Sequence, residues 1–228
     1  MSIVFFDLET AGVLPEHANI QLAAVAVDGE FQEIDTFERK IQFAEAKADP
    51  EALKINHYDR AVWEKEARPA DEVAAAFARF LDRFKGVEMV SQRTGKPYSV
   101  ARLAGHNAAT FDGPRLRAMF GSHFLPAHPM ILDTCQRALW YAVETGEHFD
   151  SLRLPALCAH WGIEFPDAHD ALADCRASIG IARHMIKDLE ATVPEPVAAV
   201  NPAPRRAPQP TVIIEHYRDS GGGYGSQF

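Results

Sequence analysis

The sequence predicts an α/β fold, a mixed sheet flanked by helices on both faces, from three observations. Strand-like segments open the chain at residues 2–6, 19–27 and 30–41. A helical pattern with an apolar stripe follows from residue 71, and helical segments dominate beyond residue 112. Because a sheet in such an arrangement buries its faces beneath helices, this order of segments indicates a layered α/β domain.

The strand segments have sequence patterns typical of a buried sheet. Residues 2–6 are continuously apolar, which predicts a central strand covered on both faces. The next two strands are joined by Asp28-Gly29, a pair typical of a two-residue hairpin. A second hairpin is expected at 87–105, and its second arm leads into His106.

The helical segments are predicted from apolar spacing and from candidate caps. Asp71 is expected to cap a helix whose apolar side chains recur at helical spacing: Val73, Phe77, Phe80, Leu81 and Phe84. Four further helices are expected at 112–120, 133–144, 151–161 and 168–190.

The composition predicts one globular domain of ordinary size, followed by a proline-rich segment and a tail. The chain has 228 residues, 47% of them hydrophobic, which suits a single globular domain over residues 1–190. Six of the 17 residues from 194 to 210 are proline, so residues 191–210 are expected to form an extended linker. The tail, residues 211–228, begins with Thr-Val-Ile-Ile-Glu-His-Tyr, a β-prone stretch that we expect to dock as a strand.

The remaining compositional features favour a soluble, cytoplasmic protein. Cys135, Cys158 and Cys175 are odd in number, lack a CxxC pair and fall in expected helices, so reduced core thiols are predicted. No signal peptide or membrane-spanning stretch is evident. The net charge of −9 argues against a protein that coats duplex nucleic acid, but less against one that grips a strand end through bound cations.

Acidic residues occur where strands end and helices begin. Asp7 and Glu9, two residues apart after the first strand, project to the same side, which is unfavourable unless a cation lies between them. Asp112 opens a predicted helix, and His169 precedes Asp174 by five residues on another. Taken singly, each has an ordinary explanation: a solvated strand end, a helix cap or a surface histidine.

Together, the order and spacing of these residues resemble those of the DEDDh (DnaQ-like) 3′–5′ exonucleases. This family includes the proofreading subunit of bacterial replicative polymerases, exonuclease I and ribonuclease T. Three motifs carry the resemblance: Phe6-Asp7-Leu8-Glu9-Thr10, His106-Asn107 through Phe111-Asp112, and His169-Asp170-Ala171 through Asp174. The similarity covers about residues 2–188, and the stretch before the third motif looks most like exonuclease I.

The resemblance implies a ribonuclease H-like fold and a two-metal mechanism. It implies that two Mg²⁺ ions, replaceable by Mn²⁺, are held by four carboxylates: Asp7, Glu9, Asp112 and Asp174. One ion would activate water and the other would stabilise the leaving 3′ oxygen, while His169 takes the proton from the water. The implied substrate contacts are Thr10, Leu14, His106 and Asn107.

Several alternatives stay open at this point. DNA is the expected substrate, engaged at a single-stranded or frayed 3′ end and releasing nucleoside 5′-monophosphates. An exoribonuclease on short RNA would carry the same motifs, and so would a polymerase-associated proofreading or interaction subunit. No membrane partner is expected, whereas residues 211–217 could bind a partner protein or a second copy of the chain.

Overall fold

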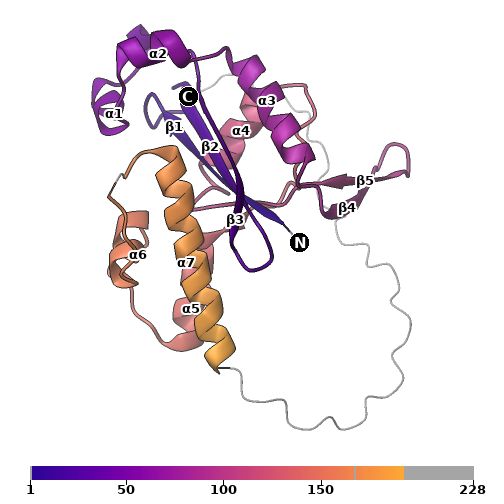
Figure 1. Ribbon diagram of the computed structural model, residues 1–228, viewed down its shortest axis with the longest axis vertical. Coiled ribbons are helices and arrows are strands. Elements are labelled where there is room, and N and C mark those ends of the chain that lie inside the picture. Colours follow the sequence, from indigo (N-terminus) through magenta and orange to yellow (C-terminus); the bar gives the residue numbers. More distant parts are fainter. Residues whose placement is uncertain (1, 167, 193–228) are drawn as a thin grey trace, which may run out of the picture. The chain divides into compact units, whose positions relative to one another are not determined.

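The computed structural model describes residues 2–166 and 168–192 (Figure 1). A five-stranded sheet has the order β3-β2-β1-β6-β7. Its strands are β1 (Ile3–Thr10), β2 (Asn19–Val27), β3 (Glu33–Lys40), β6 (Leu103–Gly105) and β7 (Leu132–Asp133). The first three pair antiparallel, whereas β6 and β7 run parallel to β1. The predicted mixed α/β sheet is confirmed.

Helices pack against both faces of this sheet. Helices α3 (Ala70–Asp82) and α4 (Asp112–Phe120) share a core with Phe6 and Leu8 of β1. On the other face α7 (Ala171–Thr192) packs against Phe5 through Ile179 and its neighbours. Helices α5 (Thr134–Thr145) and α6 (Leu154–His160) then pack against α7, and Figure 1 shows these three helices grouped together.

The first long helix illustrates how the pattern of apolar residues fixes the packing. Helix α3 begins at Ala70 after Pro69, so Asp71 lies in the first turn and is not the cap that the sequence predicts. There its charge still complements the positive end of the helix dipole. Four members of the predicted apolar stripe are buried as expected: Val73, Phe77, Phe80 and Leu81. The fifth, Phe84, lies beyond the end of α3 and is partly buried against the same core.

The connection between β2 and β3 differs from the predicted two-residue hairpin. The backbone N–H groups of Glu30 and Gln32 both donate to the Asp28 carboxylate, which organises a longer loop. Phe31 takes a left-handed conformation (φ 59°), and its ring lies 6.2 Å from that of Phe5. Packing of this ring against the core favours the longer loop over a tight turn.

The region from residue 87 to residue 105 also differs from prediction. A separate hairpin pairs β4 (Val87–Val90) with β5 (Pro97–Val100) only, and β6 then joins the main sheet beside Val4. Short elements at residues 45–66 were not expected: the 3₁₀ turn Glu45–Lys47, α1 (Pro50–Ile55) and α2 (Arg60–Glu66).

Other expectations concern the ends of the chain and its thiols. The proposed linker and the docking tail at 211–217 lie outside the described residues, except that residues 191 and 192 continue α7. Cys135, Cys158 and Cys175 are free thiols. Within the described residues, none of the helices combines the length and the apolar character required to cross a bilayer.

Candidate active site

Strand β1 directs two carboxylates to one side of the sheet. Phe6 and Leu8 are buried in the core on the α3 face, so the alternating side chains of Asp7 and Glu9 project to the α7 face. The pairing of β1 with β2 shifts register between Glu9 and Thr10, where the strand ends. The two acids therefore lie at the carboxyl end of a central strand, where a sheet commonly presents a site.

Helix α7 brings a third carboxylate to this pair. Asp174 lies in the first turn of α7, and ligand oxygens of Asp7, Glu9 and Asp174 all lie within 4.8 Å of one another. Among the described residues, this is the one group of three or more such side chains that meets this distance criterion. The sequence thus predicts the three residues that come together.

Asp112 joins the same site from the opposite layer. It is the first residue of α4, is only 4% exposed, and accepts a hydrogen bond from the Leu8 backbone N–H through Oδ1 at 3.3 Å. It lines the same cleft as the other three acids but is outside the group within 4.8 Å. Its contact with β1 places it in the carboxylate cluster rather than leaving it as a helix cap alone.

Burial raises the pKa of every carboxyl group in this cluster. Desolvation is the first cause in each case, and for Glu9 the charges of Asp174 and Asp112 add to it and raise the pKa to about 8. The pKa of Asp112 rises to about 7 and that of Asp174 to about 6. For Asp7, burial and then the neighbouring Asp112 charge raise the pKa well above its usual value.

This electrostatic strain fits a cation-binding site. Four carboxyl groups that resist ionisation together would each be stabilised as carboxylates by a bound cation. The donors are all oxygens, which suits hard divalent ions such as Mg²⁺ or Mn²⁺ better than zinc. The residues present therefore fit the metal site that the motifs imply.

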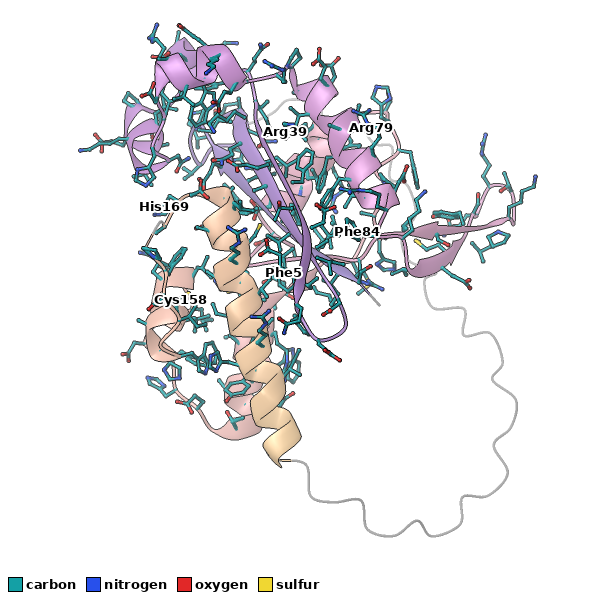
Figure 2. The ribbon with its side chains drawn as sticks, in the orientation of Figure 1. Phe5, Arg39, Arg79, Phe84, Cys158 and His169 are labelled. Carbon is teal, nitrogen blue, oxygen red and sulfur yellow. The ribbon has the colours of Figure 1, made fainter. Side chains whose placement is uncertain are left out.

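His169 lies just before α7 rather than within it. The helix begins at Ala171, whereas the sequence analysis expected it from residue 168. His169 takes a left-handed conformation (φ 68°), and its backbone N–H donates to Asp174 Oδ1 at 3.2 Å. Its side chain is exposed and lines the cleft, and Figure 2 shows it at the start of α7. The backbone thus ties the histidine to a metal-ligand candidate and leaves the imidazole accessible.

Asp170 is a site residue that sequence reasoning passed over. Its Oδ1 accepts from the backbone N–H groups of Leu172 and Ala173 and so caps α7. Its Oδ2 accepts a long hydrogen bond of 3.5 Å from Gln21 Nε2. Its charge also contributes to the raised pKa values of Asp7, Glu9 and Asp174. Its position before an apolar helical run was the available signal for this capping role.

Asp133 holds the loop that carries the second motif. Its Oδ1 accepts from the Asn107 backbone N–H at 3.0 Å, and its Oδ2 accepts from that of Ala109 at 2.9 Å. The same carboxylate caps α5 by accepting from Cys135 and Gln136. Four backbone donors on one buried carboxylate fix the path of the loop toward Asp112.

His106 and Asn107 both line the cleft, as expected, but are also held by protein contacts. His106 Nε2 lies 2.8 Å from the Leu152 carbonyl and Nδ1 lies 2.9 Å from Thr134 Oγ1. Burial lowers the pKa of His106, which favours a neutral imidazole that donates through Nε2. Asn107 has a left-handed backbone (φ 57°), and its Oδ1 accepts a hydrogen bond from the Thr110 hydroxyl.

Thr10 and Leu14 lie outside the lining of the cleft. The Thr10 hydroxyl is buried and donates to the Gly12 carbonyl at 2.9 Å. Leu14 is 49% exposed, and its carbonyl accepts from Arg115, as does that of Val13. Their contact with a terminal nucleotide stays a prediction.

The cleft itself is open and of moderate size. Its volume is about 700 Å³, within the range of sites that take small molecules. The carboxylates and His169 form its polar end. Its other walls include aromatic, apolar and basic side chains: Phe111, Phe165, Leu152, Leu154, Pro155 and Arg153.

Fold and site together define a ribonuclease H-like domain of the α/β class with a carboxylate centre at the end of β1. Residues 4–94 match the model of the family described as Exonuclease (RNase_T). The resemblance that the motifs predict, including the likeness to exonuclease I, is confirmed by this match and by the fold.

Solved structures of exonuclease I share this fold. They include E. coli exonuclease I in complex with a dT13 oligonucleotide (22% identity, TM-score 0.64, covering 83% of this chain and 42% of that chain). The zinc-bound E. coli enzyme in complex with single-stranded DNA matches at 23% identity and a TM-score of 0.64, covering 84% of this chain and 41% of that chain. A moderately thermophilic exonuclease I from Methylocaldum szegediense matches at 22% identity and a TM-score of 0.63, covering 84% of this chain and 41% of that chain.

The chain thus spans about two fifths of the length of these structures. At this level of identity the likeness concerns the fold. No curated protein matches the sequence.

Proposed function

We propose that this chain is a divalent-metal-dependent 3′–5′ exonuclease that releases nucleoside 5′-monophosphates, preferentially from DNA. The observation that carries the proposal is the convergence of Asp7, Glu9 and Asp174 within 4.8 Å, with Asp112 and His169 in the same cleft. The match of residues 4–94 to the exonuclease family supports it.

The carboxylates are assigned the role of metal ligands. A phosphodiester is an anion, and four ionised carboxylates would repel it unless cations neutralised the site. Bound divalent ions would supply Lewis acidity toward water and compensate the negative charge on the phosphoryl group. Asp7, Glu9 and Asp174 would hold these ions, and Asp112 would complete the set from α4.

His169 is assigned the role of general base. Its imidazole is exposed in the cleft, and histidine is the side chain that most often serves as a general base near neutral pH. The hydrogen bond from its own N–H to Asp174 fixes its backbone beside the ligand set. It would accept one proton from the attacking water. The hydroxide then bonds to the phosphorus of the terminal nucleotide while the bond from that phosphorus to the 3′ oxygen of the preceding nucleotide breaks, and this oxygen takes a proton from solvent.

The walls of the cleft are assigned to the terminal nucleotide. Phe111 and Phe165 offer ring faces or edges against which bases can stack. Arg115 lies over the Phe111 ring at 4.5 Å and bonds the carbonyls of Val13 and Leu14, so it braces this wall. A cleft of this size accommodates a strand end better than a duplex.

The test is hydrolysis of matched oligonucleotides by the purified chain with Mg²⁺. We expect 5′-labelled single-stranded DNA to shorten progressively, mononucleotide 5′-phosphates to accumulate, and RNA of the same sequence to react more slowly. A 3′-blocked oligonucleotide and an Asp174→Asn variant serve as controls. Internal cleavage, undiminished attack on the blocked end, or activity in excess EDTA would each refute the proposal, and faster RNA hydrolysis would reverse the substrate preference.

A further inference from the structure

Three arginines surround a second hollow outside the carboxylate cleft. Arg39 of β3, Arg68 after α2 and Arg79 of α3 line a hollow of about 360 Å³, together with Glu72 and small apolar side chains. We call it the arginine hollow. A neighbouring hollow of about 630 Å³ shares Arg39 and Arg68 and adds two lysines and two glutamates: Lys40, Lys65, Glu38 and Glu66. Figure 2 labels Arg39 and Arg79 close to each other in the upper part of the view.

These guanidinium groups lack the counter-ions that other cations of the domain possess. Among the side chains that the structure describes, no carboxylate oxygen lies within 4.0 Å of Arg39, Arg68 or Arg79. By contrast, Arg83, which follows α3, pairs with Asp35 of β3 at 2.5 Å. In a chain of net charge −9, three neighbouring unpaired arginines form a local positive field suited to an anion.

Contacts other than ion pairs hold Arg39 and Arg68 in place. The Arg39 guanidinium lies over the ring of buried Phe37 at 5.4 Å and donates to the Glu38 carbonyl at 2.6 Å. Arg68 donates through Nη1 to the Ala67 carbonyl at 3.1 Å. Arg79 projects from α3, whose opposite face is fixed in the core. Guanidinium groups ordered in this way lose less freedom when they bind a ligand.

The sheet register relates the arginine hollow to the carboxylate cleft. Arg39 pairs with Leu22, and Leu22 pairs with Leu8, which stands between Asp7 and Glu9. The backbone of Arg39 is therefore two strand spacings, about 10 Å, from that of Leu8. By the same alternation the Arg39 side chain lies on the α3 face with Leu8 and Leu22, opposite the face to which Asp7 and Glu9 project. A strand that reaches both the cleft and the arginine hollow must therefore pass around β3, which is an edge strand.

We propose that the arginine hollow binds backbone phosphates of the single strand whose 3′ end occupies the cleft, a few nucleotides upstream. The planar guanidinium fork matches the geometry of phosphate oxygens and binds them in pairs. This inference rests on the proposed exonuclease function, and it adds an anchoring site that favours long substrates over short ones.

The test compares long and short oligonucleotides with the double variant Arg39→Gln/Arg79→Gln. Binding of oligo(dT) of about 20 nucleotides is measured by fluorescence anisotropy with Ca²⁺ in place of Mg²⁺, at several salt concentrations. Loss of two phosphate contacts should reduce the slope of log Kd against log salt by about 1.4 and raise Kd about tenfold at low salt. Hydrolysis of a pentanucleotide with Mg²⁺ should stay within about twofold of wild type.

Two further variants separate this site from general charge effects. Arg83→Gln/Lys85→Gln makes the same charge change at the end of α3, but its cations are already paired with Asp35 and Asp82. It should leave the salt slope unchanged. Arg39→Lys/Arg79→Lys keeps the positive charges but lacks the planar guanidinium groups. It should therefore show the wild-type salt dependence of Kd but only part of the wild-type affinity.

The outcomes distinguish the arginine hollow from the proposed function. Three results would overturn the arginine hollow while wild-type hydrolysis stands. The salt dependence of Kd could be unchanged in the Arg39→Gln/Arg79→Gln variant, or this variant could hydrolyse the pentanucleotide as poorly as it binds the long strand. The Arg83→Gln/Lys85→Gln variant could also reduce the salt dependence by the same amount. Absence of hydrolysis by the wild-type chain would instead overturn the exonuclease assignment. Thermal unfolding of each variant checks that these exposed substitutions leave the fold intact.

Discussion

Replacing Glu9 by Gln should stabilise the metal-free protein at neutral and alkaline pH. Burial and the charges of Asp174 and Asp112 raise the pKa of Glu9 from 4.5 to about 8. Each unit of pKa difference between folded and unfolded states corresponds to about 1.4 kcal/mol. Ionising this carboxyl group in the folded state therefore costs up to about 5 kcal/mol at pH 8. Glutamine has nearly the same shape and no charge, so it avoids this cost.

The sign of the pH dependence follows from proton binding. Between pH 4.5 and 8 the folded protein binds the Glu9 proton more tightly than the unfolded chain does. The stability of the wild type should thus be fully present below about pH 4.5 and should fall as pH rises toward 8. The free energy of unfolding of the Glu9→Gln variant should lack this part of the decline with pH. At low pH the free energies of unfolding of the two proteins should become equal.

Thermal unfolding in EDTA at several pH values measures this effect. In a domain of this size 1 kcal/mol shifts Tm by about 2–4 °C, so we expect Glu9→Gln to melt at least about 5 °C above wild type at pH 8. Added Mg²⁺ should raise the Tm of the wild type more than that of the variant. Glu88→Gln, on the exposed β4–β5 hairpin, is the control. A variant that melts at or below wild type at pH 8, or an equal difference at pH 4.5, would refute this electrostatic account.

Four other predictions test the site. Asp7→Asn and Asp174→Asn should each abolish hydrolysis in the oligonucleotide assay while circular dichroism shows a native fold; activity within tenfold of wild type would contradict the ligand assignment. His169→Ala should lower kcat by about 10²–10⁴-fold near neutral pH, and a pH-rate profile should show the deficit shrinking where hydroxide is abundant. Asp133→Asn should lower Tm and kcat together, because it replaces one of the two oxygens that accept from four backbone N–H groups by an NH₂ donor, at a cost of about 1–3 kcal/mol. Removal of residues 193–228 should leave hydrolysis of a pentanucleotide unchanged. Loss of hydrolysis in the truncated protein would show that the tail completes the catalytic domain.

The core of the fold could be predicted because its patterns are local. Alternating and continuous apolar runs indicated β2 and the helices that cover the sheet. The first strand was placed at 2–6, yet β1 continues to Thr10, because Leu8 keeps the alternation while the intervening acids turn to the site. Helices α1 and α2 were missed since each is one to two turns long and its start depends on one aspartate cap, Asp49 or Asp59.

The candidate site could be predicted where its residues lie in short sequence motifs. Asp7, Glu9 and Asp174 come together as their spacing and order suggested. The supporting residues were harder to find because their role lies in tertiary contacts. Asp133 acts on a loop 24 to 26 residues before it, and no local pattern reveals that reach. The arginine hollow is similar, since its side chains come from three separate segments.

The carboxylate cluster also has a consequence for how the protein is synthesised. Its members meet in space but are far apart in the sequence, with Asp7 on the first strand and Asp174 on the last helix. At roughly 5–20 residues per second, ribosomes would take about 10–30 s to pass from one to the other. Until α7 has emerged, the nascent chain lacks part of its ligand set. Under the proposed function, a partly made copy, or one cut short by premature termination, would lack the complete metal site and could not hydrolyse the nucleic acids that surround the ribosome.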